Sequence, residues 1–196
     1  MAEELGHALA RSGWPVISGL AEGIDAAVHE GCLQADGAPV AVLGTGLDRV
    51  YPRHHGALQK AVSHQGLLIS ERSSQDPVQR GHFARRNRLI VAFASALVVV
   101  ECPERSGALI SARLAEQRSC PVWVVPGDAL RWSARGSNAL LQIQAAPLLS
   151  ADAFVRISDQ GLCSRISLSR FHPRSTRTRS GRSNSNCCRP WPLGPP

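Results

Sequence analysis

Cationic side chains gather around one aromatic ring between residues 80 and 88. Five of these nine residues are arginine or histidine, and a phenylalanine and an asparagine lie among them. Arginine neutralises phosphate groups, and an exposed phenylalanine offers a face on which any base can stack. These residue types favour contact with single-stranded nucleic acid. The candidate residues are Arg80, His82, Phe83, Arg86, Asn87 and Arg88.

A purely structural interpretation fits the composition of the same segment equally well. A run of charges is also typical of a solvated helix start. Phe83 can pack as a hydrophobic staple, and one arginine of such a cluster often pairs with a nearby acid, here Glu71 or Glu101. The nucleic-acid hypothesis therefore requires arginines that face the turn at Ser106 and are free of carboxylates.

A candidate anion site follows the strand predicted at residues 97–100. This β-branched run has no polar alternation, as expected of a central parallel strand covered on both sides. Ser106 and Gly107 come next, and a helix is predicted to begin behind them. Unpaired N–H groups at a helix N-terminus attract anions, so this turn is predicted to bind a phosphate.

The loop from Gly19 to Gly23 joins a predicted strand to a predicted helix. Its glycines permit a tight turn and close backbone approach, so a phosphate cradle and a plain turn fit equally well. Asp25 and His29 lie one helical turn apart, which suits an acid–base pair or half of a metal site. No third partner is near, so a structural hydrogen bond is favoured, and we expect no metal and no cofactor.

A dinucleotide fingerprint is only half present in the next loop. Gly44 and Gly46 follow a buried strand, but Arg49 stands where the third glycine of that fingerprint should be. The loop has a defined polar and aromatic character instead, through Asp48, Arg49 and Tyr51. A passive nucleotide-binding function is disfavoured by this broken pattern.

Buried strands alternate with helices about six times along the chain. This order predicts an α/β fold with a doubly wound, mostly parallel, Rossmann-like sheet. The chain starts on a helix at residues 2–12, which predicts that a leading strand has been lost. The predicted strands are 15–18, 39–43, 67–70, 97–100 and 120–125, and further helices are predicted at 24–34, 54–64, 109–117 and 139–144.

The net charge of +7 divides unevenly between two parts of the chain. Residues 157–196 hold seven arginines and one acid, which leaves 15 basic and 14 acidic groups for residues 1–156. We therefore expect a domain at 1–156 and a disordered Arg/Ser/Pro-rich tail at 157–196. The abrupt change in composition favours the hypothesis that a reading-frame change produced this tail. Sequencing the locus tests it, and an intact frame through residue 196 would defeat it.

Composition also narrows the protein class. No apolar run reaches the length of a membrane span, and the start Met1-Ala2-Glu3-Glu4 is acidic, so a soluble cytoplasmic protein is expected. Cys32, Cys102 and Cys120 lie singly in apolar surroundings without metal-ligand spacing. They are interpreted as small buried hydrophobes in a reducing compartment.

Several separated motifs resemble the central domain of the DNA processing protein A family (DprA/Smf) between about Trp14 and Ala146. The resemblance implies a Rossmann-like homodimer, not an enzyme, that binds single-stranded DNA, protects incoming DNA and loads the RecA recombinase in natural transformation. The motifs are SGLAEGIDAAVH (18–29), VLGTGLDRVYP (42–52), LISE (68–71), HFARRNRLI (82–90), SGALISARLA (106–115), VPG (125–127) and RGSNALL (135–141).

The resemblance also implies which positions touch DNA. It assigns a basic contact to Arg80, base stacking to Phe83 and a further contact to the Ser111 hydroxyl. The other implied positions are Arg86, Asn87, Arg88, Ser106 and Gly107. The cationic cluster and the glycine loop add His82, Gly19 and Gly23 as candidate DNA contacts.

The sequence departs from the family pattern in several places. Ala84, Ala108, His55 and Gln144 replace residues common in the family, and its opening strand with a Gly-Ser-Arg turn is absent. A lysine-decarboxylase-like nucleotide phosphoribohydrolase is the alternative enzyme class, because Glu101 and Glu104 precede Ser106-Gly107. The expected Pro-Gly-Gly and Gly-Thr-x-x-Glu elements of that class are missing.

Overall fold

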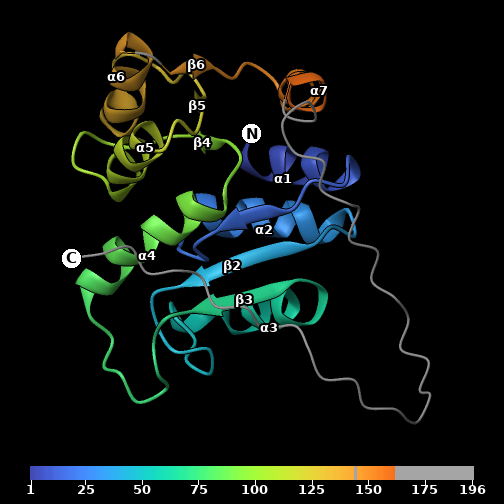
Figure 1. Cartoon of the computed structure of the whole chain (residues 1–196), viewed down its shortest axis with the longest axis vertical. Helices are drawn as coiled ribbons and strands as arrows, with labels where there is room; N and C mark the ends of the chain where they lie inside the picture. The colour runs from blue at the N-terminus through green and yellow to red at the C-terminus, as the bar shows by residue number, and fades with distance from the viewer. Residues whose placement is uncertain (144, 162–196) are drawn as a thin grey trace, which may run out of the picture. The chain divides into compact units, whose positions relative to one another are not determined.

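The computed structural model describes residues 1–143 and 145–161 (Figure 1). Most of the predicted tail lies outside these residues. The helices are α1 (Ala2–Arg11), α2 (Ile24–Gln34), α3 (Gly56–Gln65), α4 (Arg80–Phe93), α5 (Gly107–Gln117), α6 (Arg135–Ile143) and α7 (Ala151–Gly161), with 3₁₀ turns η1 (Arg53–His55) and η2 (Trp132–Ala134). The strands are β1 (Val16–Ser18), β2 (Pro39–Leu43), β3 (Leu67–Ser70), β4 (Leu97–Val99), β5 (Val122–Val124) and β6 (Ala146–Pro147).

The strands form two parallel ladders of three. The first has the order β1-β2-β3, with Val16 opposite Pro39 and Val40 opposite Leu67. The second has the order β4-β5-β6, with Leu97 opposite Val122. The α/β, Rossmann-like fold is confirmed, since the orders 3-2-1 and 4-5-6 are those of the two halves of such a sheet. The predicted sheet is nevertheless interrupted, because no ladder joins β1 to β4 among the described residues.

Apolar side chains of strands and helices make three buried clusters. One joins α1 to β4, β5 and α7, where the rings of Trp123 and Phe154 meet edge to face at 5.3 Å. The others lie around β2 with α3 and around β4 and β5 with α5 and α6. The fully or nearly buried members are Leu5, Leu148, Ala151 and Phe154; Leu20, Ala41, Leu43 and Val62; and Val99, Cys102 and Val124.

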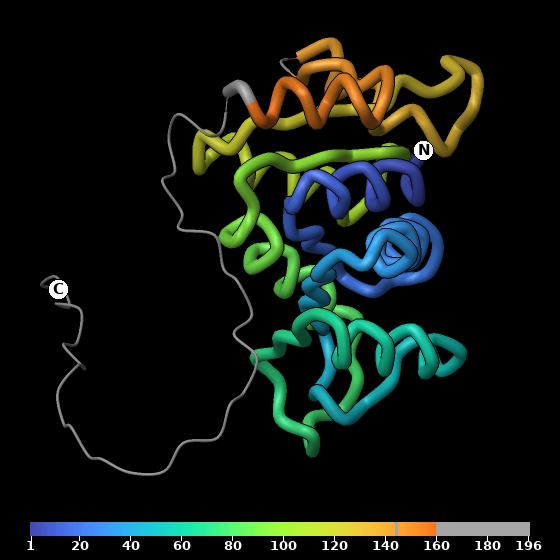
Figure 2. The backbone as a smooth tube through the Cα atoms, turned by 90° about the vertical axis from the view of Figure 1, so that its right-hand side faces the viewer, coloured from blue at the N-terminus to red at the C-terminus, as the bar shows by residue number. Residues whose placement is uncertain are grey.

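The packing of α4 sets the position of the candidate site. Helices α1 and α2 lie side by side (Figure 2). Helix α4 crosses from the end of the first ladder toward α5, and it contacts β1, β2 and α5. The basic cluster is therefore the first half of a packed helix and not a loop.

The predicted buried face of α4 needs correction. The spacing of Leu89, Ile90, Phe93 and Ala94 predicts one buried helix face, but Phe93 is 53% exposed, and Val91 is buried instead. Helix α7 runs through Gly161, so the predicted domain boundary at residue 156 falls inside a helix. The predicted bounds of α2, β2 and β3 coincide with those observed.

In the described part of the chain, every helix is too short or too polar to cross a membrane.

Candidate nucleic-acid interface

Helix α4 divides the cationic cluster between its two faces. Arg80, Arg85 and Arg88 lie on the exposed side, whereas Arg86 is only 6% exposed. A helical residue and the one two positions away point in different directions, so a helix packed against strands cannot present all of these side chains to solvent. The four arginines therefore cannot play one common role.

Arg86 is built into the interior. Its Nη1 donates a hydrogen bond to the carbonyl oxygen of Val42, one residue beyond the point where β1 leaves β2. Its guanidinium lies against Gly19 so closely that a Cβ at that position would overlap it. Arg86 therefore offers little surface to a phosphate in the observed conformation, and its phosphate contact stays a prediction.

Asp25 and His29 complete a polar cluster around this guanidinium. Burial lowers the pKa of Arg86, and the nearby Asp25 carboxylate opposes the shift. Burial also lowers the pKa of the fully buried His29 to about 4; Asp25 and the Val40 carbonyl oppose this shift, and Arg86 adds to it. Within the residues described, neither ring nitrogen of His29 meets the geometry of a hydrogen bond. The predicted Asp25–His29 hydrogen bond is therefore not formed.

The Gly19–Gly23 loop is a strand-to-helix turn closed by Asp25. The carboxylate oxygen Oδ2 of Asp25 accepts hydrogen bonds from the amides of Gly19 and Ala21, each at 3.2 Å. These amides are the donors that a phosphate cradle needs, and a carboxylate already holds them. Gly19 is buried and Gly23 is exposed, with a φ of 85° at the start of α2. Of the two interpretations left open above, this geometry favours the plain turn.

Arg88 pairs with an acid on the surface. Its Nη2 lies 2.6 and 2.7 Å from the two carboxylate oxygens of Glu71, and both side chains are about half exposed. An exposed pair of this kind contributes only about 0–1 kcal/mol, so a phosphate can compete for the guanidinium. Arg80 and Arg85 make no ion pair within residues 1–143 and 145–161. They are the uncompensated cations of α4.

Phe83 packs against Gly44, directly after the carboxyl end of β2, the middle strand of the first ladder. A Cβ at residue 44 would lie 2.7 Å from its Cδ1, so Gly44 permits this close approach. Its ring centroid is 4.9 Å from that of Tyr51, with the planes tilted by 39°. Phe83 is only half-buried, so its ring keeps an accessible surface beside Tyr51.

His82 is also half-buried, and its Nδ1 makes no hydrogen bond in the described part of the chain.

The start of α5 is held by side chains rather than left open. The Ser106 hydroxyl accepts a hydrogen bond from the Ala108 amide at 3.2 Å, which caps the helix. Asn87 donates to the Gly107 carbonyl at 3.3 Å, and so does Ser111 at 3.4 Å. Ser111 is 7% exposed, so little of it is open to a ligand, and its DNA contact stays a prediction. Gly107 remains exposed at the helix start.

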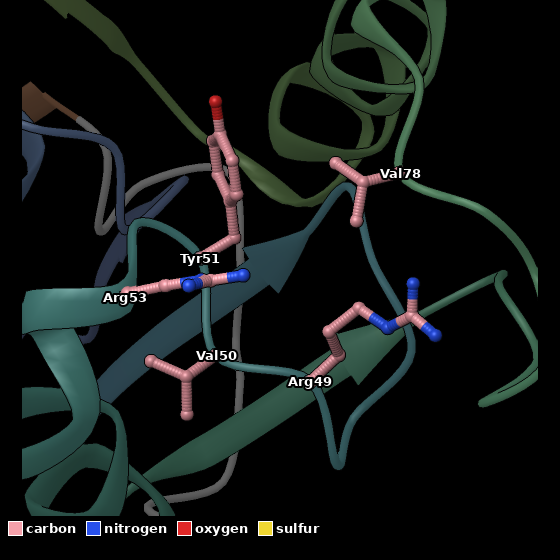
Figure 3. A pocket seen from close by; sticks show the side chains of 5 residues that line it. All are labelled: Arg49, Val50, Tyr51, Arg53 and Val78. Atoms are coloured by element: carbon pink, nitrogen blue, oxygen red, sulfur yellow. The ribbon is translucent and has the colours of Figure 1, made fainter.

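A pocket that the sequence did not single out lies next to Phe83. Its volume is about 440 Å³, and Figure 3 shows the five side chains that line it: Arg49, Val50, Tyr51, Arg53 and Val78. Three of them repeat at alternate positions, as Arg-x-Tyr-x-Arg. That spacing of cations around an aromatic was the available signal, and it is the same combination that drew attention to α4.

One of the two carboxylates considered for catalysis, Glu101, already has partners in the structure. Glu101 accepts a hydrogen bond from the Ser133 hydroxyl and lies 3.9 Å from a guanidinium nitrogen of Arg131. The RGSN segment beyond it is structural: Asn138 exchanges two hydrogen bonds with Gly127, at 3.0 and 3.1 Å. The described residues contain no group of three potential metal ligands.

Sequence comparisons with known proteins identify the family. The family model described as DNA recombination-mediator protein A matches residues 1–158. The chain is 39% identical to protein Smf of Synechocystis sp. over 147 residues, which cover 75% of this chain and 37% of that protein. It is 34% identical to DNA processing protein DprA of Bacillus subtilis over 144 residues, which cover 74% of this chain and 48% of that protein.

A solved structure is similar as well. It is that of DNA processing protein A from Helicobacter pylori, described for its single-stranded DNA binding mode. The TM-score is 0.73 at 29% identity, over 81% of this chain and 72% of the other. The chain spans less than half the length of the two curated relatives named above.

Proposed function

Because the chain belongs to the DNA recombination-mediator protein A family, we propose that it binds single-stranded DNA without cleaving it, as part of DNA processing in natural transformation. The observation that carries the proposal is the exposed surface at the start of α4, where uncompensated arginines flank an accessible aromatic ring. Cations on phosphates and a ring under a base are the two elements of strand binding that does not depend on sequence.

The predicted site residues take different parts in this proposal. Arg80 and Arg85 bind phosphates directly, and Phe83 stacks on a base. Arg88 joins them when a phosphate displaces Glu71. The exposed amide of Gly107 adds one donor at the N-terminus of α5.

The buried residues position this surface. Arg86 lies one helical turn after Phe83 and ties α4 to β2 through Val42. Asn87 ties the same helix to Gly107. Together these two anchors fix how α4 presents its outer face, while the surface side chains make the contacts.

Family membership also supports the wider setting of the proposal. The protein acts in the cytoplasm as a homodimer and passes the strand to the RecA recombinase. No cofactor takes part, and no covalent step is required. The phosphoribohydrolase alternative gains no support, because Glu101 is held by Ser133 and Arg131. Release of free base from a nucleoside monophosphate would speak for that alternative, and we expect none.

Oligonucleotide binding across a salt series tests the proposal. Fluorescence anisotropy of a labelled oligothymidylate gives the affinity at each salt concentration. Arg80→Gln should lower the magnitude of the salt slope by about 0.7, the value for one phosphate contact on a single strand. Arg118→Gln is the matched control, since that residue is exposed at the opposite end of α5 from Gly107. An Arg80→Gln variant with the wild-type slope would exclude the α4 surface from the contact.

A further inference from the structure

The pocket beside Phe83 has the composition of a nucleotide site. Tyr51 is 49% exposed and Val78 39%, so both an aromatic and an aliphatic surface are accessible in it. Arg49 and Arg53 line the same pocket (Figure 3). Its volume of about 440 Å³ falls in the usual range for small-ligand pockets, about 300–1,000 Å³.

The charge of the pocket is not neutralised from within. Neither Arg49 nor Arg53 makes an ion pair in the part of the chain that the structure describes. Asp76, an acid of the neighbouring loop, lies 3.9 Å from Arg72 instead. Two guanidinium groups without carboxylate partners in one pocket favour an anionic ligand, and arginine is well suited to phosphate.

The walls of the pocket are held in place by the adjoining loop. Arg49 donates to the Ser74 carbonyl at 3.2 Å, and the Asp76 carboxylate accepts from the Ser73 amide at 3.3 Å. The first bond connects the loop that carries Tyr51 to the loop that carries Val78, and the second lies within the loop that carries Val78. A ligand therefore meets a pocket that is already formed, which lowers the entropic cost of binding.

The pocket is continuous with the proposed strand-binding surface. The rings of Tyr51 and Phe83 are neighbours, with centroids 4.9 Å apart. Their tilt of 39° means that the two rings do not stack face to face on each other. Each ring thus offers a separate edge or face to a ligand that runs along this side of the molecule.

We propose that this pocket binds a second nucleotide of the strand that passes Phe83. Tyr51 stacks on the base, Val50 and Val78 supply apolar walls, and Arg49 and Arg53 bind the phosphates on either side. This inference rests on the proposed function and deepens it, because it extends the contact from the start of α4 to the loop between β2 and α3.

A free mononucleotide offers the same chemistry of base and phosphate. The continuity with Phe83 favours a nucleotide within a strand, and the experiment separates the two sources. Thymidine monophosphate serves as the probe for the free nucleotide. Oligothymidylates of about 4 and about 16 nucleotides, the range of common single-strand site sizes, serve as the probes for the strand.

The first test substitutes residues that line the pocket. Tyr51→Leu removes the stacking face and keeps an apolar contact with Phe83, while Tyr51→Phe retains the ring and serves as the control. Loss of one stacked base predicts weaker binding of the longer oligonucleotide by roughly 5- to 150-fold, with the salt slope unchanged. Arg53→Gln should lower the magnitude of the slope by about 0.7, whereas Arg118→Gln should leave it unchanged.

The outcomes separate the failure of this inference from that of the proposed function. If wild-type protein binds the strand while Tyr51→Leu and Arg53→Gln bind it as wild type does, the pocket proposal is overturned alone. If wild-type protein binds no oligonucleotide, both are overturned. If Tyr51→Leu loses thymidine monophosphate and keeps full strand affinity, the pocket is a mononucleotide site and the strand proposal is wrong.

A second measurement does not depend on how the variants fold. An oligonucleotide carrying 5-iododeoxyuridine is irradiated with the wild-type protein, and the crosslinked peptides are identified by mass spectrometry. Crosslinks to Tyr51 as well as Phe83 support the proposal. Crosslinks confined to α4 contradict it.

Discussion

Replacing Arg86 by alanine should destabilise the protein rather than remove a phosphate contact. The side chain is 6% exposed and donates to the Val42 carbonyl, so the variant leaves that oxygen without this donor and opens a cavity beneath Gly19. A buried unsatisfied polar group costs about 1–3 kcal/mol, and the cavity adds to this. We expect a loss of about 3 kcal/mol in the free energy of unfolding, or about 6–12 °C in Tm for a protein of this size.

Thermal denaturation followed by circular dichroism measures this loss, and the salt series measures the phosphate contact separately. Arg86→Ala should bind DNA with an unchanged salt slope at a temperature where it remains folded. Arg88→Ala is the matched variant: its exposed pair with Glu71 contributes at most about 1 kcal/mol, so its Tm should hardly move. An Arg86→Ala protein with the wild-type Tm and a slope smaller by about 0.7 would refute the buried role.

A double-mutant cycle with Gly19 tests the position of the Arg86 guanidinium directly. Gly19→Ala alone should be destabilising, because the new Cβ overlaps the Arg86 guanidinium. In the Arg86→Ala background that overlap is gone, so the cost of Gly19→Ala should fall sharply. Neighbouring residues commonly couple by about 0.5–3 kcal/mol. Additive effects of the two substitutions would mean that the guanidinium does not lie where the structure has it.

Three further predictions follow from other buried groups. The folded-state pKa of His29, about 4, lies below its usual 6.5, so the free energy of unfolding should fall by about 3 kcal/mol as the pH drops from about 6.5 to 4. Urea denaturation at several pH values measures this fall, and His29→Gln should make the free energy of unfolding less dependent on pH. Ser111→Ala should cost about 1 kcal/mol and leave DNA binding unchanged, as denaturation and anisotropy would show. Burial raises the pKa of Cys32 to about 11, so iodoacetamide should not label it at pH 8 unless urea is added, as peptide mass spectrometry would show.

The sequence located the elements well and the helix faces poorly. Runs of apolar residues predicted the bounds of β2 and β3, because a buried parallel strand needs continuous apolar residues. In α4 the same reasoning placed Phe93 inside, although it is 53% exposed, and it expected Arg86 at the surface, although it is buried. A buried arginine is rare, and the acceptor that holds this one, the Val42 carbonyl, is 44 residues away in sequence. No local pattern reveals such a partner.

The candidate site was predictable by residue type but not by conformation. Arg80 and Phe83 are accessible as expected, whereas the Gly19 loop and Ser111 make hydrogen bonds within the protein. Composition cannot distinguish an amide that is free for phosphate from one already bound by Asp25, since both interpretations use the same glycines. The pocket at Tyr51 was missed for another reason. Arg49 and Arg53 flank Tyr51 in the sequence, but this loop lies near Phe83 only because β2 ends beside α4.

The buried cluster explains why the β1–α2 loop and the start of α4 depend on each other. Asp25 closes the loop through two backbone amides, and its carboxylate offsets part of the cost of burying Arg86. Arg86 in turn fixes the helix turn that carries Phe83, whose ring packs on Gly44 beside Tyr51. A change in this interior should therefore weaken strand binding by displacing the aromatic surface, without altering the number of phosphates neutralised. Affinity and salt slope report on different parts of the molecule, and measuring both separates the residues that position the site from those that touch DNA.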